Sequence, residues 1–439
     1  MITSKCCLLI YLKNLLYCLE KKIEILKNKK VLIITYYWPP SGGAGVQRWL
    51  KFSKYLPKFG WDPVVFTPEN PDVPLEDITL LGEVSSSVQV LKTPIFEPSR
   101  VVSLFGRKMS TTRMGASNKS RNQTSIIKGF ISWVRGNLFI PDARVTWVKP
   151  AVKYVNKWIR ENHIDAIITT GPPHSMHLIG LGVKKTYPEL KWISDFRDPW
   201  SDMDYLDDFK MGNRAKRKLI EMEKKVVEYS DKITITSPSI VKTLLGDGNK
   251  EKAVLIQNGW DSVDFEEVKA PANQSTVFKI GHFGSLYGSR NVPGLWRAVK
   301  KWNLIERLKI EVYLVGSVGE EIKLELKDHP HVKFIPSLSH KQSVIEMVGC
   351  DALLLVQNDT DASRKCTPGK VFEYIACERP ILSICNSPSD LATQLKNWGL
   401  PFCDHEDEDA AYEMLKKITK NDAPLTVDPS PYERKALTK

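Results

Sequence analysis

The stretch VLIITYYWPPSGGAGVQRWL, residues 31–50, decides the fold of the first half of this 439-residue chain. Its opening run, VLIIT, is apolar up to the threonine and predicts a buried strand. A loop rich in Pro and Gly then leads into a helix that we expect to reach about Leu56. Gly60 ends that helix, and DPVVFT, residues 62–67, follows as a second strand. The order strand, loop, helix, strand predicts a βαβ unit with two parallel strands.

The same alternation of strands and helices continues through the first half of the chain and begins again in the second half. Further strands of the first half are expected at 164–170, 191–195, 232–236 and 253–257, with helices over 174–186 and 214–229. The second half begins with KIGHF, residues 279–283, a turn at GSLYGSRN and a helix over 293–302. Its other strands fit 309–315, 331–335, 352–357 and 380–384. Both halves therefore predict an α/β fold with doubly wound parallel sheets.

Length and composition agree with two domains. A chain of 439 residues is too long for one ordinary core, and 42% hydrophobic with 26% charged residues is typical of a globular protein. The polar stretch 266–276 is the expected linker between domains at 31–265 and 277–439. The eight cysteines include no CxxC pair and no Cys/His ligand spacing, which disfavours a zinc site or a disulfide framework and favours a reducing compartment.

A second informative stretch is CTPGKVFEYIACERP, residues 366–380. Three of its residues predict a turn: Thr367, Pro368 and Gly369. Lys370 then opens a helix, and Glu373 lies on the same side of it three residues later. Backbone N–H groups and a cation can bind phosphates, and a carboxylate can bind ribose hydroxyls. The stretch therefore indicates a sugar-nucleotide site; the alternative is a capped surface helix with a Lys/Glu pair.

The net charge of +12 is concentrated in one segment, residues 99–149, which holds ten basic residues and a single acidic one, Asp142. Bulky apolar residues such as Phe130 and Trp133 lie between the cations. A basic-apolar insertion of this kind suits an anionic membrane surface. Nucleic acid would also attract it, and a solvated insertion without a ligand is the remaining alternative.

Residues 1–30 predict an amphipathic leader. Its apolar part, residues 6–19, is too short to span a bilayer and is followed by a charged run without a cleavage site. We expect a helix that lies on a membrane or packs on the protein, with a non-native leader as the alternative. No other stretch reaches the apolar length of a transmembrane helix, so a cytoplasmic protein, soluble or peripheral on the inner face of the membrane, is expected.

Seven motifs occur in order along the chain: YYWPPSGGAGVQR, TTGPPHS, DFRDPW, IQNGWD, GHFGSLYGSRN, VYLVGS and CTPGKVFEYIACERPIL. Together they resemble the retaining glycosyltransferases of the GT-B fold, in the large family 4 of nucleotide-sugar-dependent enzymes. The resemblance covers nearly the whole chain from Val31. It implies two Rossmann-like domains that face each other across a cleft, with the acceptor mainly on the first domain and the sugar nucleotide mainly on the second.

The same resemblance assigns roles on the donor side. It implies that Arg290 and Lys370 are catalytic cations, which would stabilise the charge on the departing nucleoside diphosphate. The implied donor-binding residues are Gly284, Ser285, Thr367, Pro368, Gly369 and Glu373. The chain departs from the family pattern at Cys366, which stands where the first of two acids seven residues apart is expected. The contact with the donor sugar is therefore open.

On the acceptor side the resemblance places the glycines of the first loop, Gly42 and Gly43, near the donor phosphates or the acceptor; a simple tight turn is the alternative. The candidate acceptor residues beyond them are Gln47, Arg48, His174, Arg197 and Asp198. The first two would bind an anionic acceptor. His174 would act near the acceptor or the 6-position of the sugar, or be structural. For the last two, an ion pair that fixes the loop is the alternative to acceptor binding.

The expected reaction is sugar transfer with retention to a hydroxyl of a glycan or lipid-linked acceptor, as in surface polysaccharide synthesis. No spacing typical of a Ser/His/Asp or Cys/His triad argues for a covalent route. We expect no metal and no cofactor besides the nucleotide-diphosphate sugar, and no nucleic-acid partner. The alternatives are a GT-B sugar-nucleotide epimerase or hydrolase, and a basic membrane- or nucleic-acid-binding scaffold. The ending SPYERKALTK resembles the start of a last helix that crosses back to the first domain.

Overall fold

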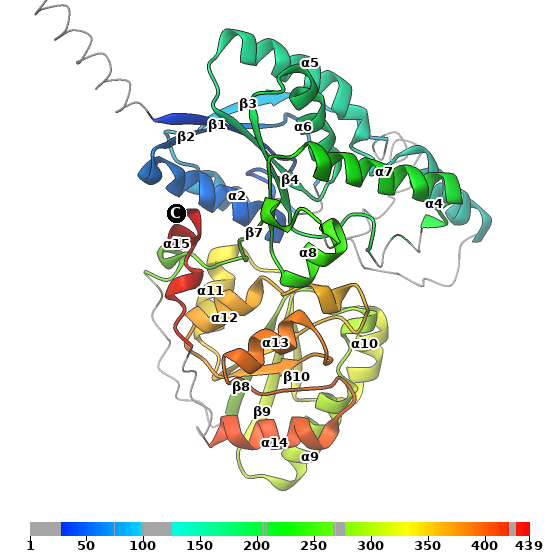
Figure 1. Cartoon of the computed structure of the whole chain (residues 1–439). Helices are drawn as coiled ribbons and strands as arrows, with labels where there is room; N and C mark the ends of the chain where they lie inside the picture. The colour runs from blue at the N-terminus through cyan, green and yellow to red at the C-terminus, as the bar shows by residue number, and fades with distance from the viewer. Residues whose placement is uncertain are drawn as a thin grey trace, which may run out of the picture.

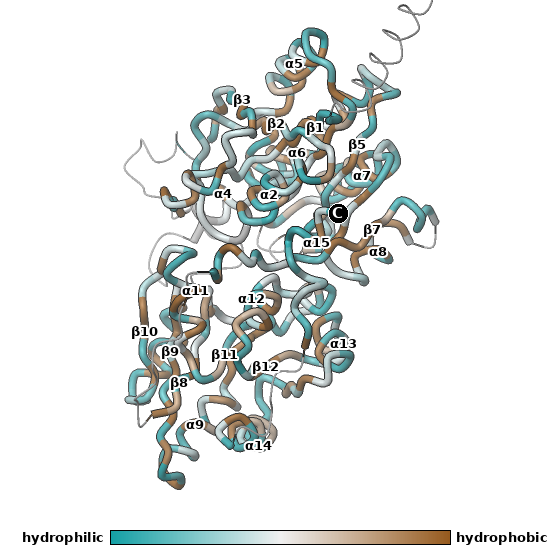
Figure 2. Tube along the Cα trace, turned by 90° about the vertical axis from the view of Figure 1, so that its left-hand side faces the viewer, coloured by the Kyte–Doolittle hydropathy of each residue, from teal (hydrophilic) through white to brown (hydrophobic). Residues whose placement is uncertain are grey.

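The computed structural model describes residues 28–439, except 74, 99, 101–124, 204–205, 207–208, 247, 267, 269–276 and 421–426. The chain forms two α/β domains, which lie one above the other in Figure 1 and again in the perpendicular view of Figure 2. Most of the predicted leader, the predicted linker and half of the segment 99–149 lie outside the described residues.

The first domain is built on a seven-stranded sheet in the order β3-β2-β1-β4-β5-β6-β7, and all its neighbouring strands are parallel. Its strands are β1 Lys29–Ile34, β2 Trp61–Pro68, β3 Gln89–Thr93, β4 Ala166–Gly171, β5 Lys191–Phe196, β6 Lys232–Ile235 and β7 Ala253–Leu255. Its helices are α2 Ala44–Tyr55, α4 Ser125–Leu138, α5 Val145–Glu161, α6 Ser175–Thr186, α7 Asn213–Tyr229 and α8 Pro238–Leu245.

The second domain has a six-stranded parallel sheet in the order β10-β9-β8-β11-β12-β13. Its strands are β8 Val277–Phe283, β9 Lys309–Val315, β10 Val332–Ile335, β11 Ala352–Val356, β12 Ile381–Ile384 and β13 Phe402–Cys403. Its helices are α9 Pro293–Ile305, α10 Glu320–Glu325, α11 His340–Val348, α12 Lys370–Ala376, α13 Asp390–Asn397 and α14 Glu408–Thr419. The predicted fold class, two doubly wound halves, is confirmed.

Both faces of the first sheet are covered, as its apolar strands require. On one face Trp147 of α5 stacks on Phe66 of β2, with ring centroids 4.9 Å apart, in a core that α6 and α7 also line. On the other face Val46 and Leu50 of α2 pack in a separate cluster. Trp147 is fully buried, so the end of the predicted insertion 99–149 already belongs to the domain core.

The end of the chain returns to the first domain. Helix α15, Arg434–Thr438, packs against α2, and the two lie together at the domain junction in Figure 1. Two backbone hydrogen bonds hold the approach to α15: Trp260 N–H donates to Tyr432 O (3.1 Å), and Arg434 N–H donates to Trp260 O (2.8 Å). The predicted crossing of the last segment to the first domain is confirmed.

A buried ion pair fixes α2 on its sheet. The guanidinium of Arg48, 1% exposed, donates to the carboxylate of Asp195 at 2.9 Å. Asp195, at the end of β5, also accepts from Trp49 Nε1 (2.8 Å), Thr170 Oγ1 (2.8 Å) and Thr234 Oγ1 (2.6 Å). One carboxylate therefore joins a helix and three strands.

Replacing Arg48 by Met should lower the free energy of unfolding by about 3–5 kcal/mol, because Asp195 would stay buried without its cation. Urea denaturation measures the loss. Lys54→Met, a partly exposed position on the same helix, serves as the matched control and should cost less than about 1 kcal/mol. Equal losses in the two variants would contradict this account of the ion pair.

Candidate active site

Two glycines, which expose their backbone, lie close together at the carboxyl ends of β8 and β9, and one of them is close to the side chain of Lys370. Gly284 follows β8 with φ +145°, a conformation that favours glycine, and a Cβ there would lie 3.4 Å from Lys370 Cε. Gly316, after β9, approaches so closely that its Cβ would lie 2.2 Å from Gly284 O. Ligands of open α/β sheets bind at this edge. The structure therefore brings Gly284 and Lys370, predicted from distant motifs, into one place.

Arg290 lies on the same side of the domain, in the short 3-10 helix Gly288–Arg290. Its Nη1 donates to Ser285 O at 3.0 Å, and its Nε donates to Asn358 Oδ1. Burial lowers the pKa of this guanidinium. The predicted residues Ser285 and Arg290 are thus in direct contact, with the cation held in place by two acceptors.

His282, the second-to-last residue of strand β8, is a residue that the sequence analysis missed. Its Nδ1 lies 3.0 Å from Leu354 O, so Nδ1 carries the proton. Burial lowers the pKa of His282 to about 4, and the positive charges of Arg290 and Lys370 act in the same direction. The imidazole is therefore neutral, and both predicted cations are close enough to lower its pKa further. Its only sequence signal is a histidine inside an otherwise buried strand.

Glu373 lies on the first turn of α12 beside Lys370, with 3.9 Å between Oε2 and Nζ. Its Oε1 lies 3.3 Å from His340 Nε2. Burial alone would raise the pKa of Glu373, but the bond from His340 and the charge of Lys370 outweigh it and lower the pKa to about 2. An ionised carboxylate beside a partly exposed lysine is the arrangement that the sequence predicted here.

The turn before α12 faces the first domain. Thr367 N–H donates to Ser237 Oγ (2.8 Å), and Ser237 Oγ–H donates to Thr367 Oγ1 (3.0 Å). A Cβ at Gly369 would lie 3.4 Å from Asn258, also of the first domain. Pro368 O accepts from Val371 N–H (3.2 Å) inside the turn. Thr367 and Gly369 thus lie at the domain junction.

Cys366 also faces the first domain. Its Sγ lies 4.0 Å from Asp198 Oδ1, and Lys365 next to it contacts Asp202. Burial raises the pKa of Asp198. At position 366, where the resemblance predicts an acid, the structure therefore has a thiol next to the carboxyl group of Asp198 of the first domain.

The residues predicted to contact the acceptor differ in burial. A Cβ added at Gly42 would lie 3.1 Å from Leu75 Cγ, so this glycine is closely packed. A Cβ added at Gly43, which has φ +84°, would have open space around it. Gln47 is buried next to Arg48 on α2. The guanidinium of Arg48 donates to Asp195 and to Gln257 O (3.0 Å). The structure therefore places Arg48 in the core rather than toward an acceptor.

Arg197 and His174 meet at the carboxyl end of β4. Arg197 donates to Gly171 O (2.9 Å) and Pro172 O (2.8 Å), and it therefore fixes the loop that carries His174. His174 is buried against Trp200, and neither ring nitrogen has a hydrogen-bond partner among the described residues. Burial lowers the pKa of His174 well below its usual value, so the ring is neutral.

The described site residues therefore form two groups, one in each domain. The residues predicted to bind or act on the sugar nucleotide lie together on the second domain: Gly284, Ser285, Arg290, Lys370 and Glu373. The N-terminal loops bring His174 and Arg197 together at β4, while Arg48 serves the core. Two residues that the sequence analysis missed belong to the group in the second domain: His340 contacts Glu373, and His282 lies within reach of the charges of Arg290 and Lys370.

Comparisons with known proteins show the fold. Neither a family model nor a curated protein matches the sequence. Among solved structures, a glycosyltransferase from Rickettsia africae ESF-5 aligns with a TM-score of 0.55 at 14% identity, over 94% of this chain and 92% of that one. The trehalose-6-phosphate protein from E. coli bound with UDP-2-fluoro glucose aligns with a TM-score of 0.56 at 11% identity, over 93% of this chain and 94% of that one.

An epimerase shares the architecture as well. A Listeria monocytogenes protein assigned as a UDP-N-acetylglucosamine 2-epimerase aligns with a TM-score of 0.54 at 11% identity, over 94% of each chain. The chain thus has the GT-B fold, which glycosyltransferases and an epimerase both use. No helix in the described part of the chain is long and apolar enough to cross a bilayer.

Replacing Glu373 by Gln should flatten the dependence of stability on pH at the acid end. The folded pKa lies below the ordinary value of 4.5, so Glu373 stabilises the fold above pH 4.5 and this contribution disappears as the pH falls toward 2. Urea denaturation should give a wild-type loss between pH 5 and 3 that exceeds that of Glu373→Gln by about 1–2 kcal/mol. The exposed control Glu413→Gln should follow the wild type; equal slopes for all three proteins would refute the assignment.

Proposed function

We propose that the chain is a retaining glycosyltransferase, of the family 4 type, that moves a sugar from a nucleotide-diphosphate sugar to an acceptor hydroxyl. The observation that carries the proposal is the contact between the bare backbone at Gly284 and the side chain of Lys370, with Arg290 and Glu373 next to it. Backbone and two cations fit a diphosphate, and the carboxylate fits ribose hydroxyls. The same fold binds UDP-2-fluoro glucose in the E. coli protein.

The proposed reaction uses these groups as follows. The bond between the anomeric carbon and the diphosphate oxygen breaks, and the acceptor oxygen bonds to the same face of that carbon. The acceptor proton passes to the leaving diphosphate. Lys370 and Arg290 stabilise the negative charge that develops on it, which lowers the barrier without a metal ion. The first domain, with Asp198 at the junction and His174 in the loop after β4, would hold the acceptor.

A sugar-nucleotide epimerase or hydrolase is the second candidate, because the Listeria protein shares the fold and because such enzymes would use the same donor group. The two candidates differ in what leaves the site. A transferase passes the sugar to an acceptor, whereas an epimerase returns a sugar nucleotide. The third candidate, a basic scaffold, needs no nucleotide at all.

Thermal unfolding in the presence of UDP, GDP, ADP, CMP and their sugar conjugates tests the donor site. One nucleoside diphosphate at about 100 times its dissociation constant should stabilise the wild type by about 2.7 kcal/mol. Lys370→Ala and Glu373→Ala should each lose most of this shift, because a hydrogen bond to a charged group contributes about 1.5–3 kcal/mol. Lys323→Ala, an exposed lysine of the same domain, should keep it.

The absence of a shift with every nucleotide would move the assignment to the scaffold. A shift that survives in Lys370→Ala and Glu373→Ala would place the nucleotide elsewhere. With the donor known, an anomerically inverted product would contradict retention, and a returned isomer of the sugar nucleotide would establish the epimerase.

We further propose that a lipid-linked or glycan acceptor is reached at an anionic membrane surface. In the described part of the segment 99–149, Trp133 and Leu138 of α4 are 45% and 63% exposed. Phe96, before the segment, is exposed as well. Exposed apolar side chains beside a basic segment are typical of peripheral membrane proteins.

Vesicle flotation tests this contact. The wild type should float with vesicles that contain about 30% anionic lipid and not with neutral vesicles, because each cation near the surface contributes about 1 kcal/mol. Trp133→Ser should weaken flotation, whereas Leu304→Ser, an exposed apolar residue on α9 of the other domain, should not. Equal flotation with both kinds of vesicle would rule out the electrostatic contact.

A further inference from the structure

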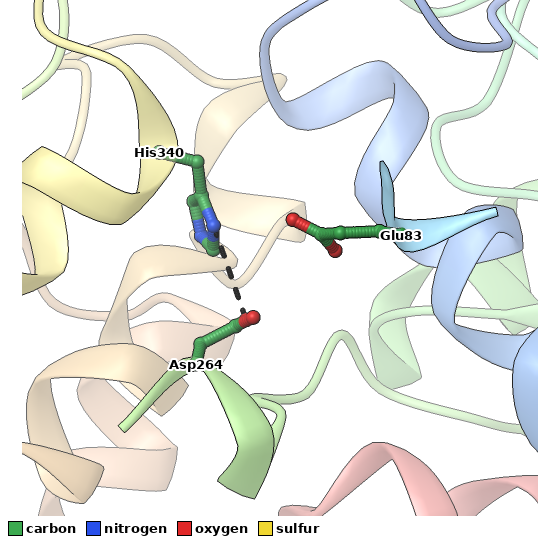
Figure 3. Close-up of side chains that lie close together, drawn as sticks. All are labelled: Glu83, Asp264 and His340. Carbon is green, nitrogen blue, oxygen red and sulfur yellow. Dashed lines mark ion pairs between the residues drawn. The ribbon is translucent and has the colours of Figure 1, made fainter. Parts of the chain in front are cut away.

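His340 lies between a carboxylate of each domain. On one side its Nε2 lies 3.3 Å from Glu373 Oε1 of α12. On the other side its Nδ1 lies 3.9 Å from Asp264 Oδ2, which belongs to the 3-10 helix Ser262–Asp264 at the end of the first domain. Figure 3 shows the imidazole pointing at Asp264. The cap of α11 holds His340 in place, because Ser339 Oγ accepts from Gln342 N–H.

The first domain surrounds Asp264 with charges. Lys51 of α2 contacts Asp264, lies 2.7 Å from Glu83 and 3.7 Å from Asp261. Since Lys51 is almost fully buried, these ion pairs are shielded from water and hold Asp264 firmly. A chain of contacts therefore runs from α2 through Asp264 and His340 to Glu373.

The same cluster has the spacing of a metal site but not its charge. Glu83, Asp264 and His340 bring one ligand atom each within 4.8 Å of one another (Figure 3). The ammonium of Lys51 already lies against both carboxylates, where a metal cation would be repelled. The cluster acts as an ion-pair network.

The groups that face His340 favour its charged form. The carboxylates are Glu373 on α12, Asp264, and Asp77 and Glu83 at the two ends of the 3-10 helix Ile78–Glu83. Lys51 on α2 is the cation that opposes them. Burial would lower the pKa of His340, but the bond with Glu373 and the charges of Glu373 and Asp264 outweigh it and raise the pKa. A charged imidazolium can donate a hydrogen bond to Glu373 and at the same time attract the carboxylate of Asp264 at 3.9 Å.

We propose that His340 is a positioning residue that orients Glu373 for the nucleotide ribose and makes ribose recognition depend on Asp264 of the first domain. The inference rests on the proposed donor site. Glu373 is held on one oxygen by His340 and approached on the other by Lys370, which leaves its remaining lone pairs for ribose hydroxyls. Without His340 the carboxylate keeps its place in the chain but loses the partner that fixes its orientation.

Isothermal titration with a nucleoside diphosphate, its 2′-deoxy and 3′-deoxy forms and inorganic pyrophosphate separates ribose recognition from phosphate binding. We would use whichever of UDP, GDP or ADP binds the wild type. The wild type should bind the nucleotide at least about tenfold more tightly than one of its deoxy forms, since the lost hydrogen bond is to a charged group. In His340→Leu this ratio should fall to within about twofold of one, while the dissociation constant of pyrophosphate changes by less than about threefold.

Two further variants keep the test decisive. His340→Gln retains a donor toward Glu373 and should keep an intermediate ratio, and it replaces His340→Leu if that protein does not fold. Asp264→Asn leaves the contact between His340 and Glu373 in place; it weakens the ion pairs of Asp264 with His340 and Lys51, and it should lower the ratio in the same direction. His331→Leu, a histidine of the same domain away from the site, should match the wild type.

The outcomes distinguish this inference from the proposed function. If the wild type binds no nucleoside diphosphate, the donor site itself is refuted. If it binds with a ribose preference that His340→Leu and His340→Gln leave intact, His340 has no positioning role. If the His340 variants lose the preference but Asp264→Asn does not, the dependence on the first domain is overturned.

Discussion

The buried carboxylate of Asp195 is the constraint on which the first domain and its site depend. An ionised carboxylate without water is stable only when several donors replace its hydration. Burial would raise the pKa of Asp195, but Arg48 and its hydrogen-bond donors lower it to about 2. Because these donors come from α2, β4 and β6, the loop before α2 and the loop after β5 take fixed places relative to each other. Arg197, two residues on, then holds the loop of His174 by its carbonyls.

The second domain is also bonded to the first domain beside the proposed nucleotide site. Thr367 bonds to Ser237, and Asp390 accepts from Ser239 N–H and Oγ at 2.9 and 2.6 Å. These contacts lie beside α8, whereas the ion pairs of Lys51 and the packing of α15 lie beside α2. Contacts at two separate places fix the relative orientation of the domains. A nucleotide at Lys370 would therefore meet a surface that both domains shape.

Sequence patterns predicted the strands that are buried on both faces, because continuous apolar runs leave little choice of structure. They did not predict β3, whose sequence QVLKT contains no buried residue, or β13, which has two residues. At the site, Lys370 and Glu373 were found because they are three residues apart on one helix. Arg48 was expected to face an acceptor, since it follows a glycine loop; its partner Asp195 is 147 residues away, and no local signal reveals such a pair. His340 was missed for the same reason.

The carboxyl group near Cys366 comes from the other domain. Within the second domain, nothing in the turn 366–369 offers a carboxylate, yet the structure sets Asp198 of the first domain 4.0 Å from Cys366 Sγ. Burial keeps the pKa of Asp198 raised, so this carboxyl holds its proton to a higher pH than an exposed aspartate. In the proposed reaction, the second domain would then stabilise the leaving diphosphate, while the acid nearest this turn comes from the acceptor side. Selection of the sugar would depend on how the two domains meet, and on the carboxylate of Asp195 that fixes the loop from which Asp198 extends.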